Sequence, residues 1–351
     1  MTSSAIRHLR VLLFVTALLA IVVARSAVAN PGLTAEWPDP ATLPQVVQEN
    51  VTIASTSPYL LTDVDSERAS ATTVHGILFL PPGPHAPHSL PAVVMLHGSG
   101  GVLASRELTY GKQLASMGIA VLVVDSFGAR PDRGSSYIER LLNITETMLI
   151  ADGYAALGNL AARPEIDSKR VVLVGFSYGA MATMYALMAD VADRMAPPGL
   201  RFAGHVSFYG PCVARFEDRR TTGAPLLMLY GGDDQVIDQK RCSAFADDLR
   251  TGGSKVDVVV YPGAVNQWDG SFARRLVGRN VVACDFEVAR DGSVHDRGSG
   301  VVMKNQATRQ VMLGLCVTDE PYPIGRDDAV RRQSDRDFGR FLARVFDLPT
   351  E

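Results

Sequence analysis

The stretch VVLVGFSYGAMATMYAL, residues 171–187, is the part of the sequence that decides the fold. Four apolar residues of strand type run into the pentapeptide GFSYG (175–179), and a helix-forming run rich in Ala and Met follows at once. A strand that turns directly into a helix around a G-x-S-x-G pentapeptide is the arrangement that presents a serine hydroxyl above a sheet. The pattern therefore predicts a nucleophile at Ser177.

Steric crowding explains why the first and last residues of this pentapeptide are glycines. The chain must reverse sharply between strand and helix, so a β-carbon at Gly175 or Gly179 would collide with neighbouring backbone. The reversal leaves the Ser177 hydroxyl exposed at the positive end of the following helix. The alternative is a packed strand–helix turn without chemistry, and the clear strand and helix patterns on either side argue against it.

Apolar runs of strand length alternate with helix-like runs on both sides of this stretch. We expect strands at residues 51–57, 73–80, 92–98, 119–125, 170–175, 203–208, 225–230 and 256–261. We expect helices at residues 107–117, 145–162, 178–189, 239–249 and 327–345. This alternation predicts an α/β fold with a mostly parallel central sheet and helices on both faces, opened by a hairpin-like pair of strands.

The N-terminus has the pattern of a signal peptide. Two arginines precede an apolar run at residues 11–23, and Ala-Val-Ala at 27–29 supplies a small-x-small cleavage signal. We therefore expect removal of residues 1–29 and export to the periplasm or the medium. A membrane span is the alternative; it is disfavoured because the run is shorter than about 20 residues and Arg25 interrupts its end. No second run of spanning length follows, so no membrane span is expected after cleavage.

Length and charge limit the classes of protein that fit. We expect an extended lead-in at residues 30–50 and one domain at 51–351, with a cystine-containing insert at about 270–322. Removing residues 1–29 leaves 31 basic and 37 acidic residues, a net charge of −6, and no basic block, so nucleic acid is not an expected partner. The chain lacks C-x-x-C and H-E-x-x-H spacings, and we expect no metal and no cofactor. No pattern specifies an oligomeric state.

Four cysteines in an exported chain usually form disulfide bonds. Three connectivities are possible, and we favour Cys212–Cys242 and Cys284–Cys316 because the partners of each pair lie near each other in sequence. Free buried thiols are the alternative.

Acyl transfer by a serine also needs hydrogen-bond donors for the developing oxyanion and an acid. One donor is expected from the backbone N–H of Tyr178, directly after the nucleophile. The Gly-rich loop that follows an early strand should supply the other, and we assign it to the N–H of Ser99. The acid should follow a later strand, where Asp233 and Asp234 come after a Gly-Gly turn. By position we favour Asp234, with Asp233 as a turn residue.

These residues resemble a known group. Between about residues 51 and 346 the chain resembles exported members of the dienelactone hydrolase family of α/β-hydrolases. The resemblance depends on six motifs in order: LHGSGG (96–101), VVDSFGAR (123–130), GFSYGA (175–180), SFYGPC (207–212), YGGDDQVIDQKRC (230–242) and YPGAVNQWD (261–269). It implies a nucleophile at Ser177, an acid at Asp234 and a Cys212–Cys242 bridge. It also implies that Asp125 and Arg130 shape the pocket mouth. We also expect His97, in the Gly-rich loop, at the pocket.

The chain departs from the family pattern at two positions. Dienelactone hydrolases proper use a cysteine nucleophile, whereas residue 177 is serine, so the resemblance does not specify a dienelactone as the substrate. In YPGAVNQWD the family has its catalytic histidine where this chain has Asn266. An amide is non-basic near neutral pH, and losing the base typically costs several orders of magnitude in rate.

One histidine could replace the missing base. His295 is the only histidine beyond Asp234, and it lies in the insert that begins directly after the lost position. We therefore expect that the insert folds over the site and presents His295 to Ser177; the alternative is a surface turn residue. His97, in the Gly-rich loop, and His205, in a strand, are weaker candidates.

Two functions follow from these residues. The first is a serine hydrolase that acts on a small-molecule ester, lactone or related acyl substrate through an acyl-Ser177 intermediate. The second is a catalytically impaired protein that binds a ligand or partner on a hydrolase scaffold, as the substitution at Asn266 suggests. We favour the enzyme because nucleophile, oxyanion loop and acid are all present.

Overall fold

Strand β5 (Ile166–Phe176), which leads into the pentapeptide, lies within an eight-stranded sheet of order β1-β2-β4-β3-β5-β6-β8-β9. The computed structural model of the protein describes residues 32–43 and 46–349, so the expected signal peptide at 1–29 lies outside the described residues. Five other strands run parallel to β5 in register: β3 (Leu90–Leu96), β4 (Ala120–Asp125), β6 (Gly204–Phe208), β8 (Leu226–Gly231) and β9 (Val256–Tyr261).

The opening strands form the expected antiparallel pair. Strand β1 (Val47–Ser57) pairs with β2 (Ser70–Leu80) over its whole length, and β2 in turn pairs antiparallel with β4. Both strands begin three or four residues earlier than expected, so part of the predicted lead-in at 30–50 is strand. The prediction of a mostly parallel α/β sheet is confirmed.

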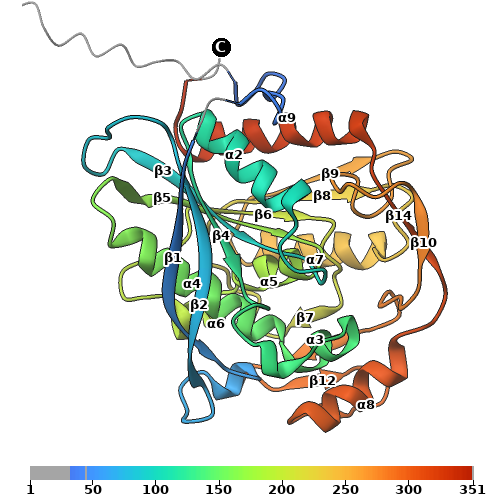
Figure 1. Ribbon diagram of the computed structural model, residues 1–351. Helices are drawn as coiled ribbons and strands as arrows, with labels where there is room; N and C mark the ends of the chain where they lie inside the picture. The colour runs from blue at the N-terminus through green and yellow to red at the C-terminus, as the bar shows by residue number, and fades with distance from the viewer. Residues whose placement is uncertain (1–31, 44–45, 350–351) are drawn as a thin grey trace, which may run out of the picture.

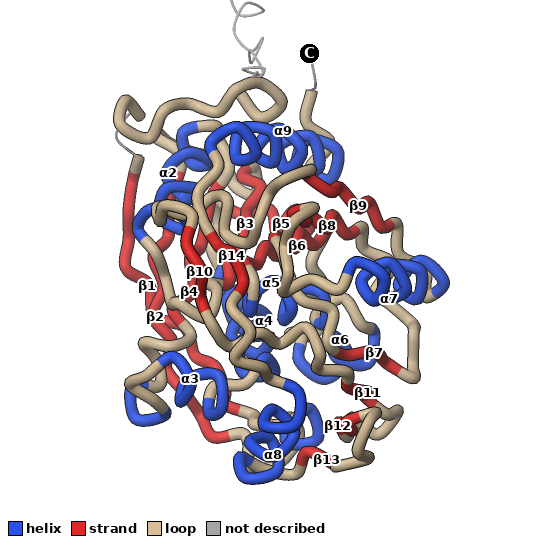
Figure 2. The backbone as a smooth tube through the Cα atoms, turned by 90° about the vertical axis from the view of Figure 1, so that its right-hand side faces the viewer, coloured by secondary structure: helices blue, strands red, loops and turns tan. Residues whose placement is uncertain are grey.

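Helices cover both faces of this sheet, as Figures 1 and 2 show. Helices α2 (Thr109–Ser116) and α9 (Asp328–Val345) lie on one face, and α4 (Glu146–Ala161), α5 (Tyr178–Tyr185), α6 (Ala189–Met195) and α7 (Gln239–Thr251) on the other. Side chains along each strand alternate between the two cores. In β3, Val94 packs towards α4 and α5, whereas Val93 packs towards α2 and α9. Burial on both faces explains why these strands are continuously apolar.

The expected helix at 178–189 is shorter than the sequence indicates. Helix α5 ends at Tyr185, because Met188 forms an isolated β-bridge with Thr221 before α6 begins. The predicted helix at 107–117 likewise starts with a π-helical turn, η2 (Ala104–Leu108). Short elements that the sequence did not indicate are η1 (Leu61–Asp63), η3 (Pro131–Arg133) and α3 (Tyr137–Asn143).

The insert at about 270–322 is folded rather than a loop. It contains helix α8 (Gln306–Cys316) and five short strands: β10 (Arg275–Val277), β11 (Phe286–Val288), β12 (Val294–Asp296), β13 (Val302–Met303) and β14 (Tyr322–Ile324). Strand β11 pairs parallel with β7 (Ala214–Phe216) of the main body, which makes a second sheet of order β13-β12-β11-β7. Strands β10 and β14 form a separate pair. The insert is therefore joined to the body by strand pairing.

Two disulfide bonds hold this region. They join Cys212 to Cys242 and Cys284 to Cys316, with Cα–Cα distances of 5.2 and 4.8 Å, so the predicted connectivity is confirmed. Arg241, beside Cys242, donates hydrogen bonds to the carbonyl oxygens of Val282 and Cys284. The bridge on α7 is thus linked to the bridge in the insert. Within the two described ranges, no helix has both the length and the apolar character that crossing a membrane requires.

Candidate active site

Ser177 stands at a strained corner between β5 and α5. Its backbone has φ +50° and ψ −109°, a conformation that residues other than glycine rarely adopt. Its N–H donates to the carbonyl of Phe208 at 2.9 Å, which attaches the corner to the neighbouring strand β6. Strain of this kind persists where surrounding structure imposes it and is concentrated at functional sites.

The glycines on either side make this corner possible. A β-carbon on Gly175 would lie 2.2 Å from the carbonyl oxygen of Gly179, and one on Gly179 would lie 2.4 Å from that of Leu96. Neither position can hold a side chain unless the backbone moves. The steric reason inferred from the pentapeptide is confirmed.

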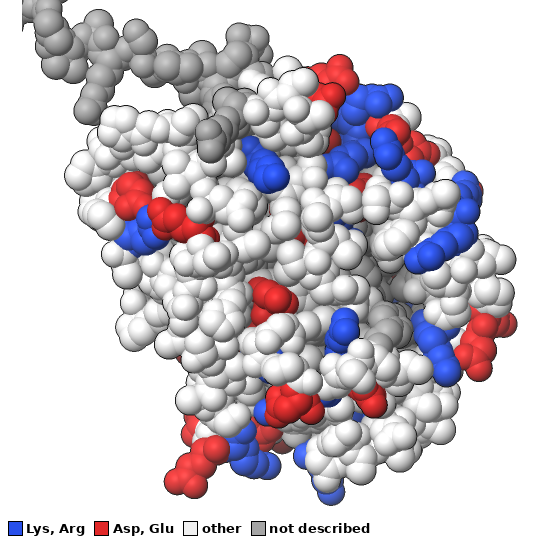
Figure 3. Space-filling model, in the orientation of Figure 1, with Lys and Arg blue, Asp and Glu red and all other residues white. Residues whose placement is uncertain are grey.

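The Ser177 side chain is partly exposed and lies on the wall of a large cavity. Among the described residues its hydroxyl has no hydrogen-bond partner, so both its proton and its lone pairs are available to a ligand. The cavity has a volume of about 960 Å³ and lies between the main body and the insert. In the orientation of Figure 1, the surface is hollowed between the body and the edge that carries β10, and most of that face is uncharged (Figure 3).

The Gly-rich loop lies against Ser177. A β-carbon on Gly98 would be 3.5 Å from the Ser177 β-carbon, and Gly98, Ser99 and Gly100 line the same cavity. The N–H of Tyr178 belongs to the first turn of α5, where backbone donors lack partners within the helix. The structure therefore brings Ser99 and Tyr178, the two expected oxyanion donors, to the cavity that holds Ser177.

Asp234 is buried in the loop after β8 and meets Asn266 there. Its Oδ2 accepts a hydrogen bond from Asn266 Nδ2 at 2.8 Å, and its Oδ1 accepts one from the N–H of Val236 at 3.0 Å. Burial raises the pKa of the Asp234 carboxyl to about 6, although both hydrogen bonds oppose that shift. Asn266 thus gives the Asp234 carboxylate an N–H donor, as an imidazole at this position would.

Asn266 is held in place by the insert. Its backbone forms a β-bridge with Ile324 of β14, and its carbonyl oxygen accepts from the N–H of Gly325 at 3.0 Å. The next residue, Gln267, has φ +63° and lines the cavity. Asn266 stands at the sequence position of the family histidine and binds Asp234, but its amide has no basic nitrogen for a serine proton.

The structure does not bring His295 to Ser177. His295 lies in β12, where its Nε2 is 2.9 Å from Ser293 Oγ. Its neighbour Val294 lines the cavity, and adjacent side chains of a strand point to opposite faces, so His295 faces away from the cavity. The expectation that the insert supplies a base through His295 is therefore corrected: the insert does cover the site, but with the other face of β12.

The other histidines have different partners. His97 is buried, with Nδ1 2.7 Å from the Gly98 carbonyl oxygen and its ring packed on Phe127; burial lowers its pKa. His205 is buried in β6 with Nδ1 3.1 Å from the Thr183 carbonyl oxygen, and burial lowers its pKa to about 4. Neither is among the residues that line the cavity. The part of the chain that the structure describes therefore has no imidazole hydrogen-bonded to Ser177.

The expected placement of Asp125 and Arg130 at the pocket also needs correction. Arg130 is buried and donates to both carboxylate oxygens of Asp152, at 2.7 and 2.9 Å, and to Ser57. Asp125 accepts from the N–H of Gly128 at 2.8 Å and lies 3.9 Å from His97 Nε2. None of His97, Asp125 and Arg130 lines the cavity, because these groups are used in the packing of the loop after β4.

A buried ion pair next to the Ser177 corner was not predicted from the sequence. Arg309 of α8 donates to both carboxylate oxygens of Glu146, at 3.2 and 2.9 Å, and to the Tyr178 hydroxyl at 3.3 Å. It therefore joins the insert to the residue that follows Ser177. A signal was present, because Arg309 shares the buried face of α8 with Met312 and Cys316 at helical spacing.

Comparisons with known proteins agree with this architecture. A model of the dienelactone hydrolase family matches residues 74–275. Two curated relatives, from Salmonella typhimurium LT2 and Escherichia coli K12, are named as candidate carboxymethylenebutenolidases; each is 25% identical over 130 residues, 37% of this chain and 47% of the relative. This chain thus spans about half the length of the curated relatives it matches. A solved dienelactone hydrolase-like promiscuous phosphotriesterase from metagenomic libraries is 20% identical, with a TM-score of 0.49 over 63% of this chain and 84% of that chain.

Proposed function

Because the chain belongs to the dienelactone hydrolase family, we propose that it is a serine hydrolase that cleaves esters, lactones or related acyl compounds through an acyl-Ser177 intermediate. The single observation that carries this proposal is the strained corner at Ser177. It presents to a cavity a hydroxyl that has no hydrogen-bond partner among the described residues, with the backbone of the Gly98–Ser99 loop against it.

The proposed reaction has two steps. The Ser177 oxygen attacks the acyl carbon and loses its proton to water, while the N–H groups of Ser99 and Tyr178 stabilise the oxyanion. The C–O bond to the alcohol breaks, and the alcohol leaves with a proton from water. A second water then attacks the acyl-enzyme, which releases the acid and restores the serine. Because Asn266 cannot take the proton, we expect slow turnover compared with an enzyme that has a complete triad.

Hydrolysis of p-nitrophenyl butyrate by the wild type and by Ser177→Ala tests this function. We expect measurable wild-type activity that is lost in the variant, because the variant has no nucleophile. Equal rates for the two proteins would overturn the proposal.

Asn266 also favours a second candidate function, ligand binding without turnover. This alternative requires that a ligand raises the melting temperature while no ester is consumed. A fluorophosphonate probe separates the two functions, because it reacts only with an activated serine. Labelling of Ser177 at a rate typical of serine hydrolases would count against the binding function.

We also propose that the protein is exported. The two disulfide bonds are compatible with an oxidising compartment, and the pattern at residues 1–29 is that of a signal peptide. N-terminal sequencing of the protein from its native host tests this, with Asn30 expected as the first residue.

A further inference from the structure

We infer that the cavity beside Ser177 takes a large hydrocarbon group of a neutral ester, and that the insert forms half of that binding chamber. This inference specifies the substrate class of the proposed hydrolase. Only its statement about turnover rests on the proposed function. Its evidence is the shape, lining and charge of the cavity, which are independent of whether the ester is cleaved.

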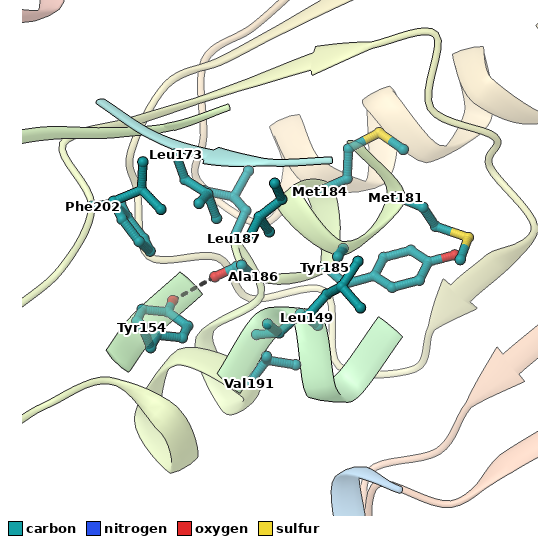
Figure 4. Close-up of a cluster of buried hydrophobic side chains, with 14 of the residues drawn as sticks. Leu149, Tyr154, Leu173, Met181, Met184, Tyr185, Ala186, Leu187, Val191 and Phe202 are labelled. Carbon is teal, nitrogen blue, oxygen red and sulfur yellow. Dashed lines mark hydrogen bonds between the residues drawn. The ribbon is translucent and has the colours of Figure 1, made fainter. Parts of the chain in front are cut away.

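Both halves of the chamber are apolar. On the body side, Met181 and Tyr185 line the cavity from successive turns of α5. Figure 4 shows their side chains extending to the same side of the helix, away from Leu173 and Phe202. On the insert side the wall includes Phe286 of β11 and Leu313 of α8.

The charges that reach the inner wall are paired. Arg309 is 5% exposed and binds Glu146, and the buried Arg106 binds Glu107 through a contact of 2.6 Å. The two other basic residues of the lining are exposed residues of the insert. Arg275 stacks on Phe272, and Arg279 pairs with Asp319. Among the described residues, the inner wall therefore offers an ionised group no unpaired charge of opposite sign to offset its desolvation.

The volume indicates the size of the occupant. About 960 Å³ equals the space of about 30 water molecules, each taking about 30 Å³ in the liquid. An acetyl or propionyl group would leave most of this apolar wall against water. Burying one further methylene group increases affinity about fourfold, so the chamber selects esters with a long or bulky hydrocarbon part.

Two neighbouring positions on α8 provide a matched pair of variants. Leu313 lines the chamber, whereas Leu315, two residues later, is 59% exposed on the outer face of the helix. Leu313→Arg puts a charge into the apolar wall, and Leu315→Arg puts the same charge into solvent. A third variant, Gly314→Phe, adds a large side chain at a residue that lines the cavity, where a β-carbon has no atom within 4 Å.

The binding experiment uses the Ser177→Ala protein, so that no ester is consumed. N-phenyl-1-naphthylamine is bound as a fluorescent apolar probe and displaced by methyl esters from methyl butyrate to methyl decanoate. We expect about fourfold tighter binding per methylene, at least tenfold weaker binding of the longer esters in Leu313→Arg and in Gly314→Phe, and unchanged binding in Leu315→Arg. Affinities that do not depend on chain length, or equal affinities in the two Arg variants, would overturn the inference.

The turnover experiment keeps the two proposals distinguishable. Wild-type kcat/KM is measured with p-nitrophenyl esters of increasing acyl length and with acetate esters of increasingly large alcohols. An increase along one series identifies whether the acyl or the alcohol part enters the chamber. Chain-dependent binding without turnover would reject the hydrolase and keep the chamber, whereas turnover with equal kcat/KM along both series would reject the chamber and keep the hydrolase.

Discussion

The corner at Ser177 and the loop at Asn266 lie at the same edge of the sheet, after the carboxyl ends of the parallel strands β5 and β9, yet they encode their chemistry differently. At the corner, the proposed chemistry depends on the backbone: a positive φ, two glycines and N–H groups. At the loop, function depends on one side chain, and an amide stands where the family pattern has an imidazole. Packing restricts which residues the corner can hold, whereas one substitution at residue 266 changes the chemistry of the loop without changing the fold.

The largest effect is expected from a side chain in the corner itself. Gly179→Ala places a β-carbon 2.4 Å from the Leu96 carbonyl oxygen, so the backbone must move and stability should fall by at least about 3 kcal/mol. Urea denaturation measures this. Gly100→Ala is the matched control in the oxyanion loop, because a β-carbon there has no atom within 4 Å, and it should change stability by less than about 0.5 kcal/mol. Equal losses in both variants would mean that packing does not fix the corner.

A smaller, pH-dependent effect is expected at Asp234. Its pKa in the folded protein is about 6, against about 3.9 in an unfolded chain. The folded state therefore binds the proton more tightly, and the resulting stabilisation is complete below about pH 4 and lost as the pH rises through 6. Between pH 4 and pH 7 the wild type should lose about 2 kcal/mol relative to Asp234→Asn.

Urea denaturation of both proteins at several pH values measures this difference. The comparison with the variant is needed because burial also raises the pKa of Asp335, to about 7, and that residue is unchanged in both proteins. Parallel stability profiles for the wild type and Asp234→Asn would show that the Asp234 carboxyl titrates normally.

The smallest effect is expected at His295. Its ring faces away from the cavity and contacts Ser293, so His295→Ala should leave the rate of fluorophosphonate labelling unchanged and alter stability by less than about 0.5 kcal/mol. A tenfold loss of labelling would restore His295 as a participant in the reaction and would contradict its placement on the outer face of β12.

The features that could be predicted best from the sequence are those decided by local steric contacts and by pairing between residues close in sequence. Residues 171–187 contain both glycines and the periodicity change at the corner, and each cystine joins residues about thirty positions apart. The parallel sheet could also be predicted locally. A strand that is buried on both faces is continuously apolar, and this pattern is visible within each strand alone.

The insert could not be predicted in the same way. Its strands have two or three residues, too few for a period to be visible, and β11 pairs with β7, which lies about seventy residues earlier in the chain. The face that His295 occupies depends on that pairing, and so does the meeting of Arg309 with Glu146. Only the register of the folded insert decides that Val294 points into the cavity and His295 points out.

The ester-hydrolysis rate of Asn266→His tests the central claim most directly. If Ser177, its oxyanion donors and Asp234 are in place and only the base is missing, the imidazole should take the hydrogen bond to Asp234 and raise kcat/KM at pH 8 by at least about 100-fold. The added activity should disappear in the double variant Asn266→His with Ser177→Ala. A folded Asn266→His protein with an intact cavity and no gain over the wild type would contradict the account.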